Sequence, residues 1–113
     1  MRINGTAISM IRGDSESIIV SCKDSNGNPV PFEEGDTVFF TVKETVNTEI
    51  KMLQKVITEF EDGKAIIDIK PEDTKHFRFQ NYVYDIQLTR ADGTVTTIIP
   101  PSKFKVKGEV TYE

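Results

Sequence analysis

The side chains best suited to catalysis are scarce in this sequence. It contains one histidine, His76, and one cysteine, Cys22. A catalytic triad and a protein-bound zinc ion each need several such groups close together, and a disulfide bond needs a second cysteine. Cys22 continues an apolar alternation, so we expect a small buried side chain and no exposed, reactive thiol. We therefore expect no enzymatic activity, no catalytic residue, no metal site and no cofactor.

Carboxylates are more common, and they gather in three short stretches at residues 33–36, 59–62 and 68–73. A glycosidase needs two carboxylates that converge on a cleft, with side chains that hold the sugar. The sequence has no tryptophan for such a platform, and these acids lie in turns and at the ends of predicted strands. We expect them to be solvent-exposed, with a weak calcium site as the alternative.

Two short motifs match known binding sequences, but a turn is the favoured interpretation of each. Arg12-Gly13-Asp14 spells an integrin-binding tripeptide, and matches this short occur by chance. A turn in which Asp14 accepts hydrogen bonds from the following backbone N–H groups explains the same residues. Residues 24–28 alternate oxygen-bearing side chains as a calcium loop does, but they lack its sixth-place glycine and closing glutamate.

Charge and hydropathy exclude further classes of function. The chain has 113 residues, with 14 Lys and Arg against 18 Asp and Glu, so its formal net charge is −4. A dedicated nucleic-acid binder needs a basic surface, and we expect no nucleic-acid partner. No apolar run approaches the ~20 residues of a membrane span, and the N-terminus lacks a signal-peptide core. We expect no membrane association.

Alternation of apolar and polar residues with a period of two dominates the chain and predicts β-strands with one face on a core. Asp62-Gly63 and Asp92-Gly93 are typical of hairpin turns, and they join residues 52–61 to 64–70 and 82–90 to 94–99; Asn26-Gly27 is a third such dipeptide. The expected core-facing residues are Ile18, Val20 and Cys22; Val38, Phe40 and Val42; Ile67 and Ile69; Tyr82, Tyr84, Ile86 and Leu88; and Phe104, Val106 and Val110.

Other segments interrupt this pattern. Pro100 and Pro101 are expected to break it, because proline cannot donate to a ladder of hydrogen bonds. Residues 44–54 are expected to form a loop that enters a strand, and residues 71–77 a single helical turn, because Pro71 suits a first helical position. The pattern predicts one domain over residues 1–113: an all-β, antiparallel β-sandwich of about seven to eight strands.

A turn and a strand late in the chain resemble the immunoglobulin-like family. Residues 71–74 (Pro-Glu-Asp-Thr) precede residues 82–86 (Tyr-Val-Tyr-Asp-Ile), as a corner precedes the strand with the buried tyrosine in that family. The resemblance implies an immunoglobulin-like sandwich in which Asp73 and Tyr84 form the structural corner. The connection through residues 75–81 is longer than the family's usual one.

The same resemblance assigns places to the family's other marker residues. Cys22 would lie where the family keeps one half of its disulfide, and Ile86 where the partner cysteine would be. The family's buried tryptophan is absent, so Phe39 or Phe40 would have to fill its volume. Stability would then come from packing alone.

A distinctive succession of turns and strands runs through the chain. It comprises Ile3-Asn4-Gly5-Thr6, Arg12-Gly13-Asp14-Ser15, residues 24–27, 35–42, 71–74 and 82–88, Asp92-Gly93, and residues 97–100 up to Phe104. This succession resembles small β-sandwich proteins of tailed phages and prophages of Gram-positive bacteria. In plan it is similar to the N-terminal module of their upper baseplate proteins, which anchors receptor-binding parts to the tail tip.

The phage resemblance implies a function. The chain would be a non-enzymatic tail or baseplate structural protein, located in the virion and assembled in the host cytoplasm. Its partners would be other tail or baseplate proteins and, because virion parts usually act in rings, further copies of itself. An adhesive or carbohydrate-binding immunoglobulin-like module of a bacterial cell-surface protein is the alternative. That alternative needs exposed aromatic side chains, and the sequence has no tryptophan and three tyrosines.

Three segments are candidate contact surfaces. Lys103, Lys105 and Lys107 share one face of a late strand, where they either protect a sheet edge or meet an acidic partner. The loop at residues 30–34 combines apolar and acidic side chains.

Two phenylalanines are the third candidate. Phe77 and Phe79 lie on one side of a strand or turn, and they either belong to the core or, if exposed, anchor an interface. His76, beside them, is expected at the surface or half-buried.

Overall fold

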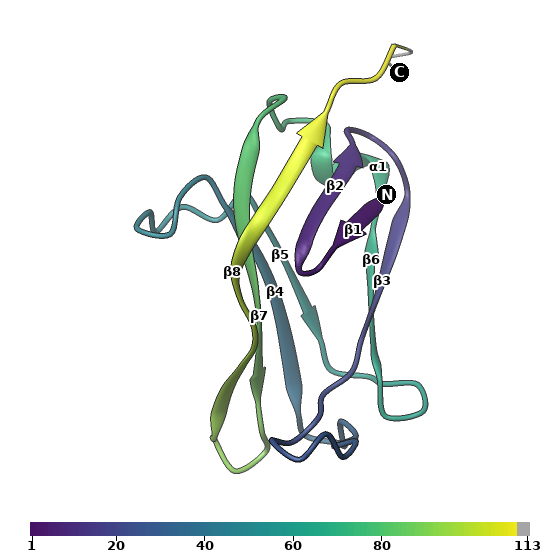
Figure 1. The fold of residues 1–113 in the computed structure, drawn as a ribbon, viewed down its shortest axis with the longest axis vertical. Helices are drawn as coiled ribbons and strands as arrows, with labels where there is room; N and C mark the ends of the chain where they lie inside the picture. The colour runs from purple at the N-terminus through teal and green to yellow at the C-terminus, as the bar shows by residue number, and fades with distance from the viewer. Residues whose placement is uncertain (111–113) are drawn as a thin grey trace.

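Two β-sheets and one short helix make up the regular structure of this protein, which the computed structural model describes over residues 1–110 (Figure 1). The chain is mostly β, as the alternation predicted. The larger sheet has the strand order β1-β2-β8-β7-β4-β5, and the smaller sheet pairs β3 with β6. The elements are β1 (Arg2–Asn4), β2 (Ala7–Ile11), β3 (Glu16–Val20), β4 (Thr37–Lys43), β5 (Leu53–Ile57), β6 (Ala65–Ile69), α1 (Pro71–Thr74), β7 (Asn81–Thr89) and β8 (Val95–Lys107).

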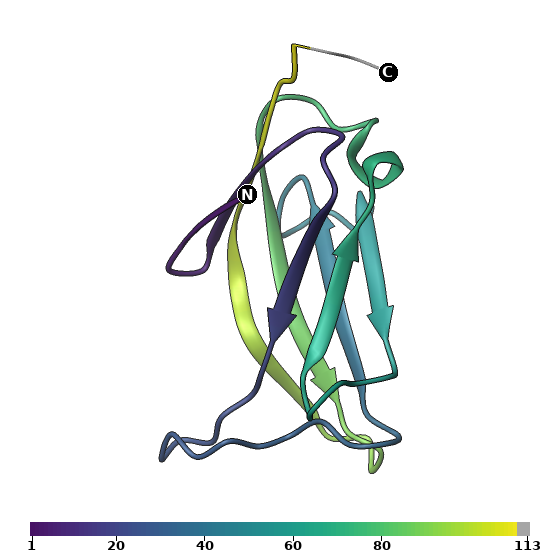
Figure 2. The same cartoon turned by 90° about the vertical axis from the view of Figure 1, so that its right-hand side faces the viewer.

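The smaller sheet lies against one face of the larger sheet, and the hydrophobic core fills the space between them (Figure 2). The period of two places alternate residues of each strand in this core. Ile18 and Val20 of β3 point inward, whereas Ile19 is 68% exposed on the opposite face. The predicted core residues that are buried are Ile18, Val20, Val38, Phe40, Val42, Ile67, Ile69, Tyr82, Tyr84, Ile86, Leu88, Phe104 and Val106.

Two of the expected core residues lie elsewhere. Cys22 was expected within a strand, but β3 ends at Val20, and Cys22 is half-buried at the margin of the core. Val110 lies beyond the end of β8 and is fully exposed. Both errors have one cause, because the alternation continues in the sequence after the strand has ended.

The prediction of a wholly antiparallel fold is wrong for one strand pair. β2 runs parallel to β8, with Ile8 opposite Phe104 and Ile11 opposite Lys107, whereas the other pairs among the described residues are antiparallel. The parallel pair is possible because β2 and β8 are far apart in the chain and need no tight turn between them.

The prediction that Pro100 and Pro101 interrupt the strand is also wrong, because β8 continues through both. Its pairing with β7 shifts register near Tyr84 and Ile86, so that the two prolines lie in a bulge. The other edge of β8 pairs with β2 only from Phe104 onward. Proline is tolerated at bulges and on unpaired edges, since no ladder hydrogen bond is lost there.

The turn at Asp62-Gly63 has the expected backbone but not the expected partners. Asp62 and Gly63 have φ values of 51° and 73°, and Glu61 and Lys64 exchange backbone hydrogen bonds of 3.0 and 2.9 Å. However, β5 pairs with β4 and β6 pairs with β3, so no hairpin extends from this turn. The turn instead carries the chain from one sheet to the other.

The other predicted hairpin and the helical turn are present. The turn at residues 92–93 closes the β7–β8 hairpin, with the Arg90 N–H donating to the Thr94 carbonyl at 2.8 Å and the Gly93 N–H donating to the Arg90 carbonyl at 2.9 Å. In α1, the carboxylate of Asp73 accepts the Lys70 N–H at 2.8 Å and pairs with Lys55 at 2.7 Å. Burial opposes ionisation of Asp73, but these interactions outweigh it and lower its pKa.

The hydrogen bond to the backbone just before β7, which was expected of the Tyr84 hydroxyl, is made by the hydroxyl of Tyr82. The Tyr82 hydroxyl accepts the Arg78 N–H at 2.7 Å and donates to the Arg78 carbonyl at 3.3 Å. The Tyr84 hydroxyl instead donates to the carbonyl of Thr6, in the turn between β1 and β2. Both rings face the core, but only Tyr82, at the start of β7, lies close enough to the backbone just before it.

Replacing Tyr82 with phenylalanine is expected to lower the free energy of unfolding by about 1 kcal/mol, the typical net value of a hydrogen bond. The variant would keep the buried ring and lose both contacts with Arg78. Urea unfolding monitored by circular dichroism measures the change. Tyr84→Phe is the comparison, and it should lose less stability, because the carbonyl of the exposed Thr6 can bond to water when the Tyr84 hydroxyl is removed. A larger loss for Tyr84→Phe would contradict this expectation.

One carboxylate predicted to be solvent-exposed is buried. Asp36 is 4% exposed, and its carboxylate bonds to Arg90 Nη1 at 2.7 Å, to the Glu33 N–H at 2.9 Å and to the Ala91 N–H at 3.3 Å. It thereby fastens the loop before β4 to the β7–β8 hairpin. Burial alone would raise the pKa of Asp36, but these hydrogen bonds and the charge of Arg90 lower it.

Candidate functional site

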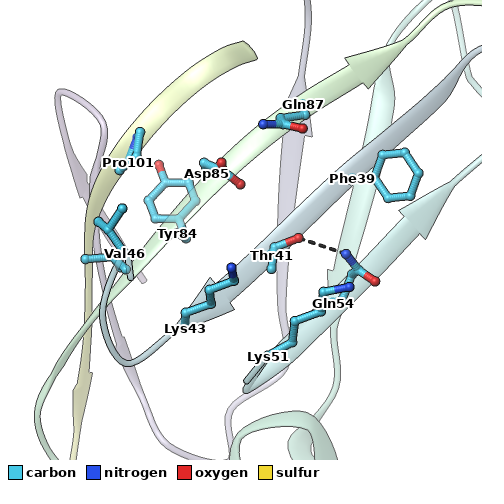
Figure 3. A pocket seen from close by; sticks show the side chains of 11 residues that line it. Phe39, Thr41, Lys43, Val46, Lys51, Gln54, Tyr84, Asp85, Gln87 and Pro101 are labelled. Atoms are coloured by element: carbon cyan, nitrogen blue, oxygen red, sulfur yellow. Dashed lines mark hydrogen bonds between the residues drawn. The ribbon is translucent and has the colours of Figure 1, made fainter. Parts of the chain in front are cut away.

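A groove of about 340 Å³ crosses the outer face of the larger sheet, on the side away from the smaller sheet (Figure 3). Its floor comes from β4 and β7, and the connection between β4 and β5 borders it. The residues that line it are Phe39, Thr41, Lys43, Val46, Lys51, Gln54, Val83, Tyr84, Asp85, Gln87 and Pro101.

Strand register brings the polar side chains of the groove together. Thr41 of β4 lies opposite Asp85 of β7 and Gln54 of β5, and Phe39 lies opposite Gln87. These residues alternate with the buried core residues of the same strands, so their side chains emerge on the outer face. The result is a polar row beside one aromatic ring.

Asp85 is the acidic group of the groove. Its side chain is half-buried, and this burial raises the pKa of the carboxyl, with the nearby charge of Lys43 acting against the rise. Next to it, Gln54 Nε2 donates to Thr41 Oγ1 at 3.0 Å (Figure 3). The groove therefore offers a carboxylate acceptor, amide groups and two ammonium groups beside apolar side chains, as a binding site for a polar chain would.

Replacing Asp85 with asparagine is expected to raise the free energy of unfolding near neutral pH, by less than about 1 kcal/mol. A raised pKa in the native state means that folding disfavours the ionised carboxyl, so removal of the charge relieves this cost. The gain should shrink as the pH falls and the wild-type carboxyl takes up its proton. Chemical denaturation of both proteins at several pH values measures it, with Glu59→Gln, at an exposed loop acid, as the control. A clear loss of stability in Asp85→Asn would contradict the expectation.

The predicted lysines extend the same face. Lys103, Lys105 and Lys107 are all exposed on β8. Lys105 pairs with both β7 and β2, whereas Lys103 pairs only with β7 and Lys107 only with β2, so protection of a sheet edge does not explain Lys105. With Lys43 and Lys51 at the groove, we call these five residues the lysine face.

Phe77 and Phe79 have different roles. Phe77 is 1% exposed and its ring lies 4.7 Å from that of Tyr82, so its prediction as an interface residue is wrong. Phe79 is 57% exposed, and the Arg12 guanidinium lies 4.4 Å from the centre of its ring. Gly108 leaves room for this ring, because a Cβ there would lie 2.9 Å from it. Phe79 remains a candidate contact, held in place before any partner arrives.

No protein-family model matches this sequence, and no curated protein matches it.

The side chains and backbone of the two remaining motifs make contacts within the protein itself. Arg12 of the integrin-like tripeptide pairs with Glu109 at 2.6 Å, and the Asp14 N–H closes the turn on the Ile11 carbonyl at 3.2 Å. In residues 24–28, the Asp24 carboxylate accepts two backbone N–H groups of its own turn.

Within residues 1–110, no three His, Cys, Asp or Glu side chains lie together in a way that could hold a metal ion. His76 is exposed, with Nε2 3.2 Å from the Met52 carbonyl. Among the helices of that same part of the chain, none has the length and apolar character needed to span a membrane.

Sequence reasoning found part of this site. It selected Lys103, Lys105, Lys107 and Phe79. It did not find the groove, because the sequence pattern was used to assign the core-facing residues of these strands and not the outward-facing residues between them. One signal was present, because Asp85 is an acid in the middle of a strand, between two buried residues. Such a position faces away from the core and can be read as part of a surface.

Proposed function

We propose that this chain is a non-enzymatic structural protein of a phage or prophage tail or baseplate, built as an immunoglobulin-like β-sandwich, that acts through protein–protein contacts. The observation that carries the proposal is the lysine face. In a protein of net charge −4, two lysines and one acid line the groove, and three more exposed lysines lie on β8 of the same sheet. Such local concentration of one charge is typical of a surface that selects a partner of opposite charge.

The strand order supports the immunoglobulin-like part of the proposal. In variable-type immunoglobulin domains one sheet contains strands G, F, C and C′, and strands B and E belong to the other. Taking β3 as strand B gives β8-β7-β4-β5 for the first group and β3-β6 for the second. The Tyr82 hydroxyl bonded to backbone just upstream fits the tyrosine corner at the start of strand F.

The composition of purified particles tests the proposed function. Tail particles released by the strain that encodes this chain would be purified by density gradient and analysed by quantitative mass spectrometry. The chain should be present in fixed ratio to other tail proteins, and antibodies against it should label one end of the tail in electron micrographs. Particles that lack the chain would overturn the proposal.

A carbohydrate-binding or adhesive immunoglobulin-like module of a bacterial surface protein is the second candidate. The composition of the groove favours it, because Phe39 lies beside Asp85, Gln87 and Gln54, and carboxylate and amide groups near an aromatic ring can hold a sugar. Titration calorimetry with oligosaccharides from bacterial cell walls tests it, with Asp85→Ala as the matched variant. Absence of saturable heat would remove this candidate.

A further inference from the structure

Charge is distributed unevenly along the molecule. Loops at residues 21–36, 58–64 and 90–94 meet at one end, the lower end in Figure 1. The only exposed lysines in these loops are Lys23 and Lys64, and Arg90 is paired with the buried Asp36. We call this region the acidic loop end, and its exposed acids are Asp24, Glu33, Glu34, Glu59, Glu61, Asp62 and Asp92.

The lysine face lies away from the acidic loop end. Strands β4 and β8 both begin at the acidic loop end, and Lys43 and Lys107 are their last residues (Figure 1). The molecule extends 43 Å along its longest axis. The acidic loop end of a rigid copy therefore has no access to its own lysine face, but it can reach that of another copy.

The segment at residues 30–34 is anchored to the protein core and exposes most of its other side chains to solvent. Phe32 is buried against Phe60, with their ring centres 5.2 Å apart, and its N–H bonds to the Gly63 carbonyl at 2.9 Å. Pro31, Glu33 and Glu34 on either side of it are exposed. An anchored loop loses little conformational entropy on binding. This loop exposes the ring of Pro31 beside the carboxylates of Glu33 and Glu34.

We propose that the acidic loop end of one copy docks on the lysine face of a second copy, with residues 30–34 at the groove. The carboxylates of Glu33 and Glu34 would meet Lys43 and Lys51, which border a floor with apolar side chains. The two surfaces differ, so the contact is head-to-tail and generates a ring or a filament. This inference rests on the proposed structural role, and it adds the partner and the surface.

Charge reversal on each surface tests the docking. One variant carries Lys103→Glu, Lys105→Glu and Lys107→Glu, and the other carries Glu33→Lys and Glu34→Lys. Sedimentation velocity over a range of concentrations, at low salt and again at about 1 M salt, where the Debye length is about 3 Å, measures association. Wild type should associate at low salt and dissociate at high salt, and each variant alone should associate at least about tenfold more weakly.

Mixing the two variants is the decisive measurement. The unchanged acidic loop end of the first fits the unchanged lysine face of the second, and the two reversed surfaces fit each other. The mixture should therefore restore association, which also shows that both variants are folded. Asp14→Lys with Glu72→Lys is the control, because it changes two exposed acids outside both surfaces and gives the same net charge as the loop variant.

Three results would overturn the docking: a wild type that stays monomeric, a mixture that does not associate, or a control variant that loses association equally. These failures are distinct from failure of the proposed function, which is judged by whether the chain is present in purified particles.

Discussion

Asp36→Ala should lower the free energy of unfolding by about 3 kcal/mol, the loss typical when one partner of a buried ion pair is removed. The variant leaves the N–H groups of Glu33 and Ala91 without their acceptor and the guanidinium of Arg90 without its counterion. It also frees the loop before β4 from the β7–β8 hairpin. Urea unfolding at neutral pH measures the loss.

The matched control for this variant is Glu34→Ala, two residues away. Glu34 is exposed at the same end of the molecule, and substitutions at such positions usually change stability by less than about 0.5 kcal/mol. Asp36→Asn keeps the size and one acceptor oxygen, so it should fall between the other two variants. Equal effects of Asp36→Ala and Glu34→Ala would show that the buried ion pair does not stabilise the fold.

The pH dependence of stability gives an independent measure of the same pair. The pKa of Asp36 is lowered in the native state, whereas an aspartate in the unfolded chain has a pKa of about 3.9. The native state therefore binds this proton less readily, so the contribution of Asp36 is complete above the unfolded pKa and is lost as the pH falls through the native pKa. The stability difference between wild type and Asp36→Asn should narrow in acid. A constant difference down to pH ~2 would contradict this assignment.

The alternating segments are the part of the fold that the sequence predicts well. Val38, Phe40 and Val42 of β4 are buried because their spacing matches the pleat of a strand, and neighbouring residues face the solvent. The residues that face outward carry the groove. The local pattern therefore indicates both faces of the strand, although it does not say which outward residues from different strands meet.

The remaining features depend on contacts between distant residues. Asp36 and Arg90 are 54 positions apart, so the sequence shows only an acid in a turn. The turn at Asp62-Gly63 has the same chemistry whether it joins two paired strands or crosses between two sheets. Pro100 and Pro101 are compatible with β8 only because of a bulge in its pairing with β7. These features are set by tertiary structure, which local propensity does not contain.

Gly63→Ala should also lower the free energy of unfolding by about 3 kcal/mol, for two separate reasons. Gly63 has a φ of +73°, and a left-handed backbone costs an L-residue about 1–2 kcal/mol. In addition, the new Cβ would lie 2.5 Å from the Cβ of Pro31 and 3.2 Å from its Cα. Relief of that overlap requires the backbone at Pro31 to move, and overpacking of this kind typically costs about 1–3 kcal/mol.

Gly27→Ala separates the two reasons. Gly27 has a similar φ of +82° in a turn of the same end of the molecule, but a Cβ there has no atom within 4 Å. Gly27→Ala should lower the free energy of unfolding by the backbone cost alone, about 1–2 kcal/mol. Urea unfolding measures both variants, and the difference between their losses is the cost of the overlap with Pro31. Equal losses of stability would mean that the backbone at Pro31 moves away from the new Cβ at no measurable cost in free energy. That result would also weaken the proposed docking, because residues 30–34 would then lack the rigidity that their contact with Gly63 is inferred to provide.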